Sequence, residues 1–129
     1  MKKKIMYIEH KTDQNDRGLA WIGLVEYSKS GRTIYFNEQA FKTCRYGNFD
    51  HNFVDIETGQ GYWISGVKKN GQDRHWSGGG KIQVQRDIVD EYLALVDFDI
   101  LDPQRFELTD IPPTNKQRFT RLENKSTHD

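Results

Sequence analysis

The chain has 129 residues, with 19 basic and 19 acidic side chains, one cysteine and 35% hydrophobic residues. Because a domain typically holds roughly 100–150 residues, this length favours one compact domain over two. No uninterrupted apolar run approaches the roughly 20 residues of a membrane-spanning helix, and the basic start Met1–Lys4 leads into a strand-like segment instead of a signal peptide. We therefore expect a cytoplasmic protein without a membrane partner. The single Cys44 cannot form an internal disulfide, which agrees with a reducing compartment.

The charge is balanced overall but not along the chain. Basic residues outnumber acidic ones by nine to six in residues 1–50, acidic residues outnumber basic ones by eight to five in residues 51–100, and the remainder carries five of each. Nucleic-acid-binding proteins usually carry a basic excess, because neutralising phosphates and releasing counterions supplies much of their affinity. The balance therefore argues against a nucleic-acid partner, while a local basic face would still be compatible with one.

Segments rich in β-branched and aromatic residues occupy the first two thirds of the chain. Their alternating pattern predicts strands over residues 5–8, 20–27, 33–36, 53–57, 62–67 and 81–85. Turn sequences follow these strands at Ser28–Gly31, Thr58–Gly61 and Lys69–Gln72, the last with Asn-Gly at its centre. Residues 38–51 mix aromatic residues with Gly and Asn, and they predict an irregular crossing with one short strand.

The strand over residues 20–27 is apolar on both of its faces. Ile22 and Leu24 point to one side, and Trp21, Val25 and Tyr27 point to the other. A strand with one solvated face alternates between apolar and polar residues instead. We therefore expect this strand at the centre of the sheet, covered on both sides.

One stretch has the period of a helix. Its apolar stripe consists of Ile88, Val89, Tyr92, Leu93 and Val96. This predicts a short helix near residues 88–96, with Asp87 as its N-cap. Beyond it, Pro103 and the pair Pro112-Pro113 interrupt any regular element. Residues 112–129 are polar and predict a mobile tail, or a short helix that orders on a partner.

These elements predict a mainly β protein. We expect a small, strongly bent antiparallel sheet or a partly open, SH3-like barrel, with one short helix after the last strand. The single domain spans residues 1–111 and the tail spans residues 112–129.

Several motifs carry a resemblance. They are Gly18–Gly23, Tyr27–Phe36, Asp55–Gly59, Tyr62–Gly66 and Lys69–Arg74. On these residues the chain resembles a family of small uncharacterised bacterial proteins, which implies a bacterial, stand-alone domain. Some similar sequences carry the name 1-deoxy-D-xylulose-5-phosphate synthase. Such thiamine-diphosphate enzymes are several times longer, and this chain lacks their Gly-Asp-Gly motif with a following Asn, so we do not expect that activity.

The segment Asp73–Lys81 is the first candidate for a binding site. Beside the glycine run Gly78–Gly80 it carries Asp73, Arg74, His75, Trp76 and Lys81. Backbone N–H groups of such a run can cradle an anion while Arg74 or Lys81 neutralises it. A nucleotide phosphate loop would need Gly-x-x-x-x-Gly-Lys-Ser or Thr before a helix, whereas a strand follows Lys81. The alternative is a long hairpin loop whose Trp76 folds back onto the core.

The sequence predicts neither a metal site nor a catalytic site. The four histidines are not spaced as metal ligands, either from one another or from Cys44. Cys44, next to Arg45, is more typical of a small half-buried residue than of a nucleophile. The acidic residues of the strand 53–57 and of the helix start are explained as solvated and capping groups. We therefore expect no cofactor, no metal and no catalytic residue.

Aromatic residues give the strongest functional indication, because they are more numerous than a core of this size can bury. The residues concerned are Trp21, Tyr27, Tyr35, Tyr46, Tyr62, Trp63 and Trp76. Rings left at the surface can form a groove for a peptide or for an unstacked base. We single out Trp63, together with the segment Asp73–Lys81, as the candidate binding face.

Three hypotheses for the function follow. The first is a non-catalytic interaction module that binds a protein or peptide through this aromatic and basic face. The second is a domain that binds RNA or single-stranded nucleic acid with the same residues, and its affinity would fall steeply with added salt. The third is an enzyme that acts on a small anionic substrate at Arg74, His75 and Lys81. The sequence leaves the oligomeric state open.

Overall fold

The computed structural model describes residues 2–11, 18–44, 51–74 and 80–126. Across these residues, eight strands form one sheet: β1 (Lys3–His10), β2 (Ala20–Tyr27), β3 (Thr33–Phe36), β4 (Gln39–Thr43), β5 (Phe53–Asp55), β6 (Gly61–Gly66), β7 (Ile82–Gln85) and β8 (Phe106–Thr109). Two short helices, α1 (Val89–Leu95) and α2 (Thr120–Ser126), follow the 3-10 turns Arg86–Ile88 and Lys116–Phe119. No helix in this described part of the chain is long and apolar enough to cross a membrane.

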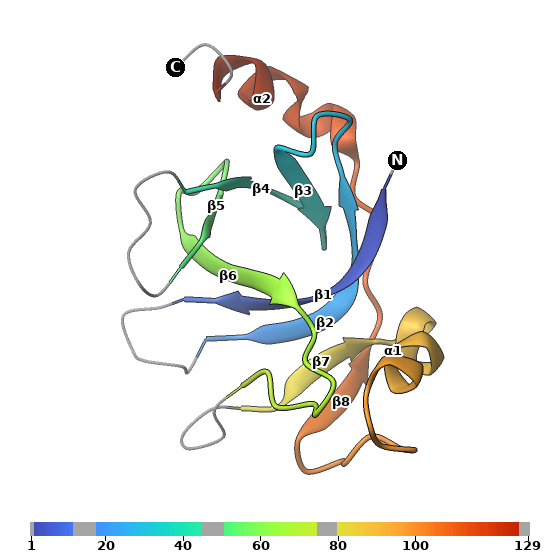
Figure 1. Cartoon of the computed structure of the whole chain (residues 1–129). Coiled ribbons are helices and arrows are strands. Elements are labelled where there is room, and N and C mark those ends of the chain that lie inside the picture. The colour runs from blue at the N-terminus through green and yellow to red at the C-terminus, as the bar shows by residue number, and fades with distance from the viewer. Residues whose placement is uncertain (1, 12–17, 45–50, 75–79, 127–129) are drawn as a thin grey trace.

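Six of the strands close into an antiparallel barrel (Figure 1). Their order is β1-β6-β5-β4-β3-β2, and the pairing of β1 with β2 completes the ring. Closure leaves these strands without a free edge. The prediction of a mainly β fold built on a small, strongly bent barrel is confirmed.

Two further strands extend the sheet outside the barrel. β7 pairs with the start of β2, and β8 pairs with β7, both in parallel. The chain between them passes through α1, as a parallel connection requires. The sequence predicts no regular element after Pro103, but β8 is only four residues long and fits between Pro103 and Pro112. Neither proline lies in the strand, so neither removes one of its hydrogen-bond donors.

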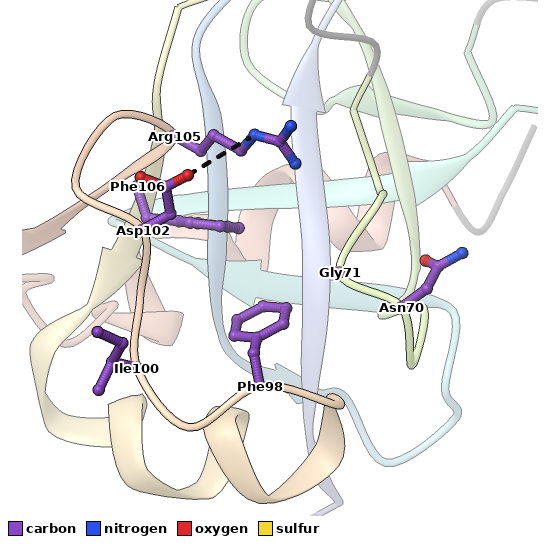
Figure 2. A pocket seen from close by; sticks show the side chains of 7 residues that line it. All are labelled: Asn70, Gly71, Phe98, Ile100, Asp102, Arg105 and Phe106. Atoms are coloured by element: carbon purple, nitrogen blue, oxygen red, sulfur yellow. Dashed lines mark ion pairs between the residues drawn. The ribbon is translucent and has the colours of Figure 1, made fainter.

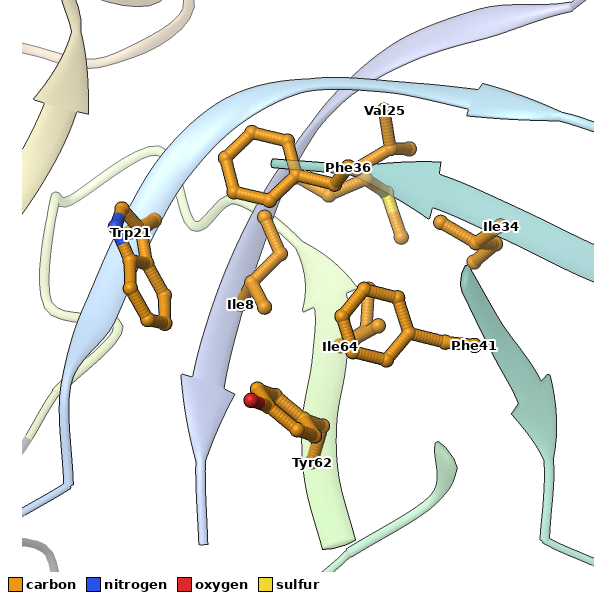
Figure 3. Close-up of a cluster of buried hydrophobic side chains, with 9 residues drawn as sticks. Ile8, Trp21, Val25, Ile34, Phe36, Phe41, Tyr62 and Ile64 are labelled. Carbon is orange, nitrogen blue, oxygen red and sulfur yellow. The ribbon is translucent and has the colours of Figure 1, made fainter. Parts of the chain in front are cut away.

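The sheet separates two hydrophobic cores. The first fills the barrel (Figure 3) and consists of Met6, Ile8, Trp21, Val25, Ile34, Phe36, Phe41, Tyr62 and Ile64. The second covers the outer face of β1, β2 and β7 and consists of Tyr7, Ala20, Ile22, Ile82, Val84, Ile88, Tyr92, Val96 and Phe106. Since β2 supplies Trp21 to one core and Ile22 to the other, the predicted central position of this strand is confirmed.

β2 changes its neighbour along its length. Residues Ala20–Ile22 pair with β7, whereas Glu26 and Tyr27 pair with β3. Between these pairings, the N–H of Leu24 donates to the side-chain Oε1 of Gln85 at 2.8 Å. A side-chain amide thus replaces a strand carbonyl where the two neighbours diverge. The ring of Phe36 lies against Gly23, where a Cβ atom would be 2.3 Å from Cε1 of that ring.

The predicted helix near residues 88–96 corresponds to α1. Its stripe faces the second core, where Tyr92 is fully buried. The predicted N-cap is wrong, because Asp87 lies inside the 3-10 turn, Ile88 takes the N-cap position, and no side chain caps either element. Asp90 and Glu91 lie in the first turn of α1, where negative charge interacts favourably with the positive end of the helix dipole.

The segment after Pro113, which the sequence suggests as a mobile tail or as a helix that orders on a partner, packs on the barrel. Phe119 is fully buried in a third cluster with Tyr35 and Ala40, on the outer face of β3 and β4. The hydroxyl of Tyr35 donates to Glu123. α2 therefore lies outside the barrel wall, next to β3 and β4 (Figure 1).

Replacing Gly23 with Ala should destabilise the protein by about 1–3 kcal/mol, since the added methyl group would overlap the Phe36 ring and crowd Gln85. The free energy of unfolding measured in urea tests this. Gly80→Ala is the matched control, because a Cβ there meets no atom of the described residues within 4 Å. Equal stability of the two variants would contradict the described packing at Gly23.

Candidate functional site

A buried pair, Tyr7 and Glu9, lies on the outer face of β1. Three of the residues singled out in the sequence lie around it, namely Trp63, Asp73 and Arg74. Tyr7 and Glu9 point to this face, and the hydroxyl of Tyr7 donates to the carboxylate of Glu9. Glu9 is only 4% exposed, and Lys11 Nζ lies 2.7 Å from its Oε2. Trp63 on β6 is the cross-strand partner of Glu9. We call the set of Tyr7, Glu9, Lys11 and Arg74 the Glu9 cluster.

Arg74 joins the Glu9 cluster from the loop between β6 and β7. It is 4% exposed, and its Nη2 donates to the carbonyl oxygen of Gly18 at 2.6 Å. Burial, followed by the hydrogen bond to Glu9 and its negative charge, raises the pKa of Tyr7 well above the ordinary value, although the charge of Arg74 acts in the opposite direction. Tyr7 is therefore a neutral donor at any physiological pH.

Asp73 fixes the same loop from within. Its Oδ1 accepts the backbone N–H of Lys68 at 3.0 Å, which closes the turn around Asn70 and Gly71. Burial raises the pKa of Asp73 above the ordinary value of 3.8. The predicted turn at Asn70-Gly71 is present, and Gly71 has φ of 71°, a conformation that favours glycine.

The other predicted site residues do not join this cluster. Lys81 is exposed just before β7, where the N–H of Ile82 donates to the carbonyl of Arg105 at 2.9 Å. Lys81 therefore lies near the start of β8. His75 and Trp76, with the glycines 78 and 79, fall outside the described residues.

The chemistry of the Glu9 cluster is that of a structural network. Its one acid, Glu9, is paired with Lys11 and accepts from the hydroxyl of Tyr7, and it is 4% exposed. A general acid or base must reach its substrate within hydrogen-bond distance, which Glu9 could not do. Among the described residues near this cluster, Trp63, 38% exposed, presents its ring at the surface, with its Nε1 donating to Ser65 Oγ at 3.2 Å. Within the described residues, no group of three or more His, Cys, Asp or Glu side chains could hold a metal ion.

The structure also brings together two residues that the sequence treats separately. Cys44 Sγ lies 3.7 Å from His51 Nε2, and both residues are half-buried. They follow β4 and precede β5, and the N–H of Cys44 donates to the carbonyl of Asn52 at 3.0 Å. One signal in the sequence could have indicated this pair. The cysteine comes just after one strand of a hairpin, and the histidine comes just before the other strand. Neither residue lines the pocket described next.

A pocket of about 220 Å3 lies between the β6–β7 loop and the segment after α1 (Figure 2). Its lining residues are Asn70, Gly71, Phe98, Ile100, Asp102, Arg105 and Phe106. We call it the Phe98 pocket. The ring of Phe98 lies against Gly71, where a Cβ would be 2.3 Å from its Cε1, and edge-on to Tyr92 at a centroid distance of 6.3 Å. The ring of Phe98 is therefore packed between the β6–β7 loop and α1.

The rim of the Phe98 pocket is mixed in character. Arg105 Nε lies 3.9 Å from Asp102 Oδ2, and both side chains are half exposed (Figure 2). Such an exposed pair contributes at most about 1 kcal/mol. Ile100 is 75% exposed, the most of any large hydrophobic residue in the described part of the chain. For the segment after α1, the sequence predicts only that its apolar residues pack on the domain. No sequence motif indicates that one of them, Ile100, remains exposed to solvent.

Comparison of the chain with protein-family models, with curated proteins and with solved structures gave no match.

Replacing Glu9 with Gln should lower the free energy of unfolding by about 1–3 kcal/mol. Removing one partner of a fully buried ion pair costs about 3–5 kcal/mol, and Lys11 retains some access to solvent. Asp110→Asn is the control, because its pair with Arg86 at 2.9 Å is largely exposed and should contribute less than about 1 kcal/mol. Similar losses in both variants, measured in urea, would contradict a buried role for Glu9.

Replacing Asp73 with Asn should not lower the stability at pH 7. An acid whose pKa is higher in the folded state than in the unfolded state costs stability as the pH rises from the unfolded value through the folded one. The wild type should therefore lose stability relative to Asp73→Asn as the pH rises above about 4. Asn keeps an oxygen for the N–H of Lys68. Chemical denaturation from acid to neutral pH measures this, and a growing advantage of the wild type would contradict it.

Proposed function

We propose that this protein is an interaction module that binds a protein or peptide at the Phe98 pocket. The observation that carries the proposal is Ile100, an aliphatic side chain 75% exposed beside an aromatic floor. Contiguous apolar surface within a polar rim is typical of interaction sites, and Ile100 continues the apolar lining that Phe98 and Phe106 supply. The polar rim here includes Asn70 and Arg105, which can donate hydrogen bonds to a partner's carbonyl or carboxylate oxygens.

The size of the pocket favours a side chain over a metabolite. Pockets for small molecules and cofactors usually measure roughly 300–1,000 Å3, and this one has about 220 Å3. A single large side chain of a partner protein fits this space better than a nucleotide or a coenzyme would. The exposed Ile100 would add contact area beside that side chain.

The character of the lining favours a protein partner over a nucleic acid. Base stacking needs ring faces that are open to solvent, whereas Phe106 is buried and Phe98 packs against Gly71. The one arginine of the lining faces one aspartate. Nucleic-acid binding would need a local basic excess.

Replacing Ile100 with Asp should lower the affinity for a bound peptide at least about tenfold, since burying an unpaired carboxylate against Phe98 costs more than about 1.4 kcal/mol. The ligand is a peptide selected by the wild-type protein from a phage-displayed random library, and calorimetry measures its affinity. Leu19→Asp is the control, because Leu19 is 56% exposed and lies outside the pocket lining.

Two results would contradict this function. One is a selected peptide that binds Ile100→Asp as tightly as the wild type. The other is the absence of any peptide enriched on the wild type. Recovery of a partner from lysate that disappears on nuclease treatment would then support the nucleic-acid hypothesis instead.

A further inference from the structure

We infer that the partner is an extended peptide, which adds as a new strand to the outer edge of β8 while one large apolar side chain enters the Phe98 pocket. This inference rests on the proposed function and specifies the binding mode. β8 is the last strand in the order of the described sheet and pairs with β7 on one side. Strand addition to such an edge is a common way to bind a peptide, with the backbone supplying affinity and pockets supplying specificity.

The direction of the backbone groups of β8 follows from its pairing. The carbonyl of Arg105 accepts the N–H of Ile82 at 2.9 Å, and the register pairs Ile82 with Phe106. In a parallel ladder, the N–H and the C=O of one residue both point to the same side of the strand, and the groups of the next residue point to the opposite side. The groups of Glu107 therefore face β7, and the N–H and C=O of Leu108 point away from β7, toward the outer edge.

The outer edge and the pocket are adjacent. Phe106 begins β8 and also lines the Phe98 pocket. At about 3.3 Å per residue, Leu108 lies roughly 7 Å further along the strand. The outward N–H of Phe106 already donates to the carbonyl of Asp102 at 2.9 Å, so the ladder to a peptide begins at Leu108. A peptide side chain two positions from the residue paired with Leu108 then lies beside the pocket without a backbone bond to the N–H of Phe106. Leu108 itself is 41% exposed and adds apolar surface at the edge.

The length of β8 favours a peptide over a second copy of the chain. A stable dimer buries roughly 1,200–2,000 Å2 in total, and a four-residue edge cannot supply that area. The strand is also flanked by Pro103 and Pro112 and carries the exposed Glu107, features that limit pairing between identical edges. A peptide anchored by a side chain in the pocket needs only a short ladder.

The test compares Leu108→Pro with Leu108→Ala, using the synthetic library-selected peptide as the ligand. Proline removes the outward N–H of Leu108 and leaves the donors to β7 in place, whereas alanine keeps that N–H and removes the side chain. We expect Leu108→Pro to weaken binding about tenfold or more and Leu108→Ala to weaken it clearly less. Circular dichroism and thermal unfolding check that both variants fold.

A second arm uses the wild-type protein and does not depend on the folding of Leu108→Pro. The same peptide is N-methylated at one residue at a time. Strand addition predicts losses at alternate residues, because every second N–H of an edge strand faces its neighbour. Uniform tolerance of N-methylation would overturn the inference, as would equal binding by Leu108→Pro and the wild type.

The two proposals fail in different ways. If Ile100→Asp weakens binding but Leu108→Pro and N-methylation do not, the pocket binds a peptide without strand addition and only this inference falls. If no library peptide binds the wild type, both proposals fall. A dimer of the free protein that Leu108→Pro dissociates, detected by light scattering, would overturn the peptide in favour of a second copy.

Discussion

One strand has to hydrogen-bond with two different neighbours on the same side, and the rest of the structure depends on how it does so. β2 closes the barrel through β3 and carries the external pair β7 and β8 through its first residues. Where the two neighbours diverge, the Leu24 N–H would lose its acceptor, and an unpaired buried N–H costs about 1–3 kcal/mol. Gln85 supplies the missing oxygen, and Gly23 leaves room for Phe36. The end of β7 is thereby tied to the barrel wall.

This arrangement explains why the candidate sites lie where they do. Because β7 extends the sheet beside the first residues of β2, the second core forms on the outer face of these strands, and α1 covers it. In the described part of the β6–β7 loop, Arg74 donates to the carbonyl of Gly18 just before β2, and Asp73 accepts the N–H of Lys68. The same stretch supplies Asn70 and Gly71 to the Phe98 pocket. The Glu9 cluster, which includes Arg74, thus ties this stretch to the chain at the start of β2.

The sequence predicts the parts that depend on local pattern. The two apolar faces around Trp21 and Ile22 place β2 at the centre, and the Asn70-Gly71 pair places its turn, because these features are fixed by side-chain alternation and by backbone conformation. β8 and the burial of Phe119 are not predictable in this way, since both depend on surfaces that exist only after the barrel has closed. The same holds for the Phe98 pocket and for the contact of Cys44 with His51. Sequence order separates these residues, and only the register of the strands brings them together.

The connection between β2 and Gln85 also has a consequence for biosynthesis. Leu24 and Gln85 are 61 positions apart, and Tyr35 and Glu123 are 88 apart. A ribosome adds roughly 5–20 residues per second, so about 3–12 s separate the synthesis of Leu24 from that of its acceptor. During this interval β2, apolar on both faces, has emerged without the residues that cover it. The nascent chain therefore leaves this apolar strand uncovered for longer than a barrel built only from neighbouring hairpins would.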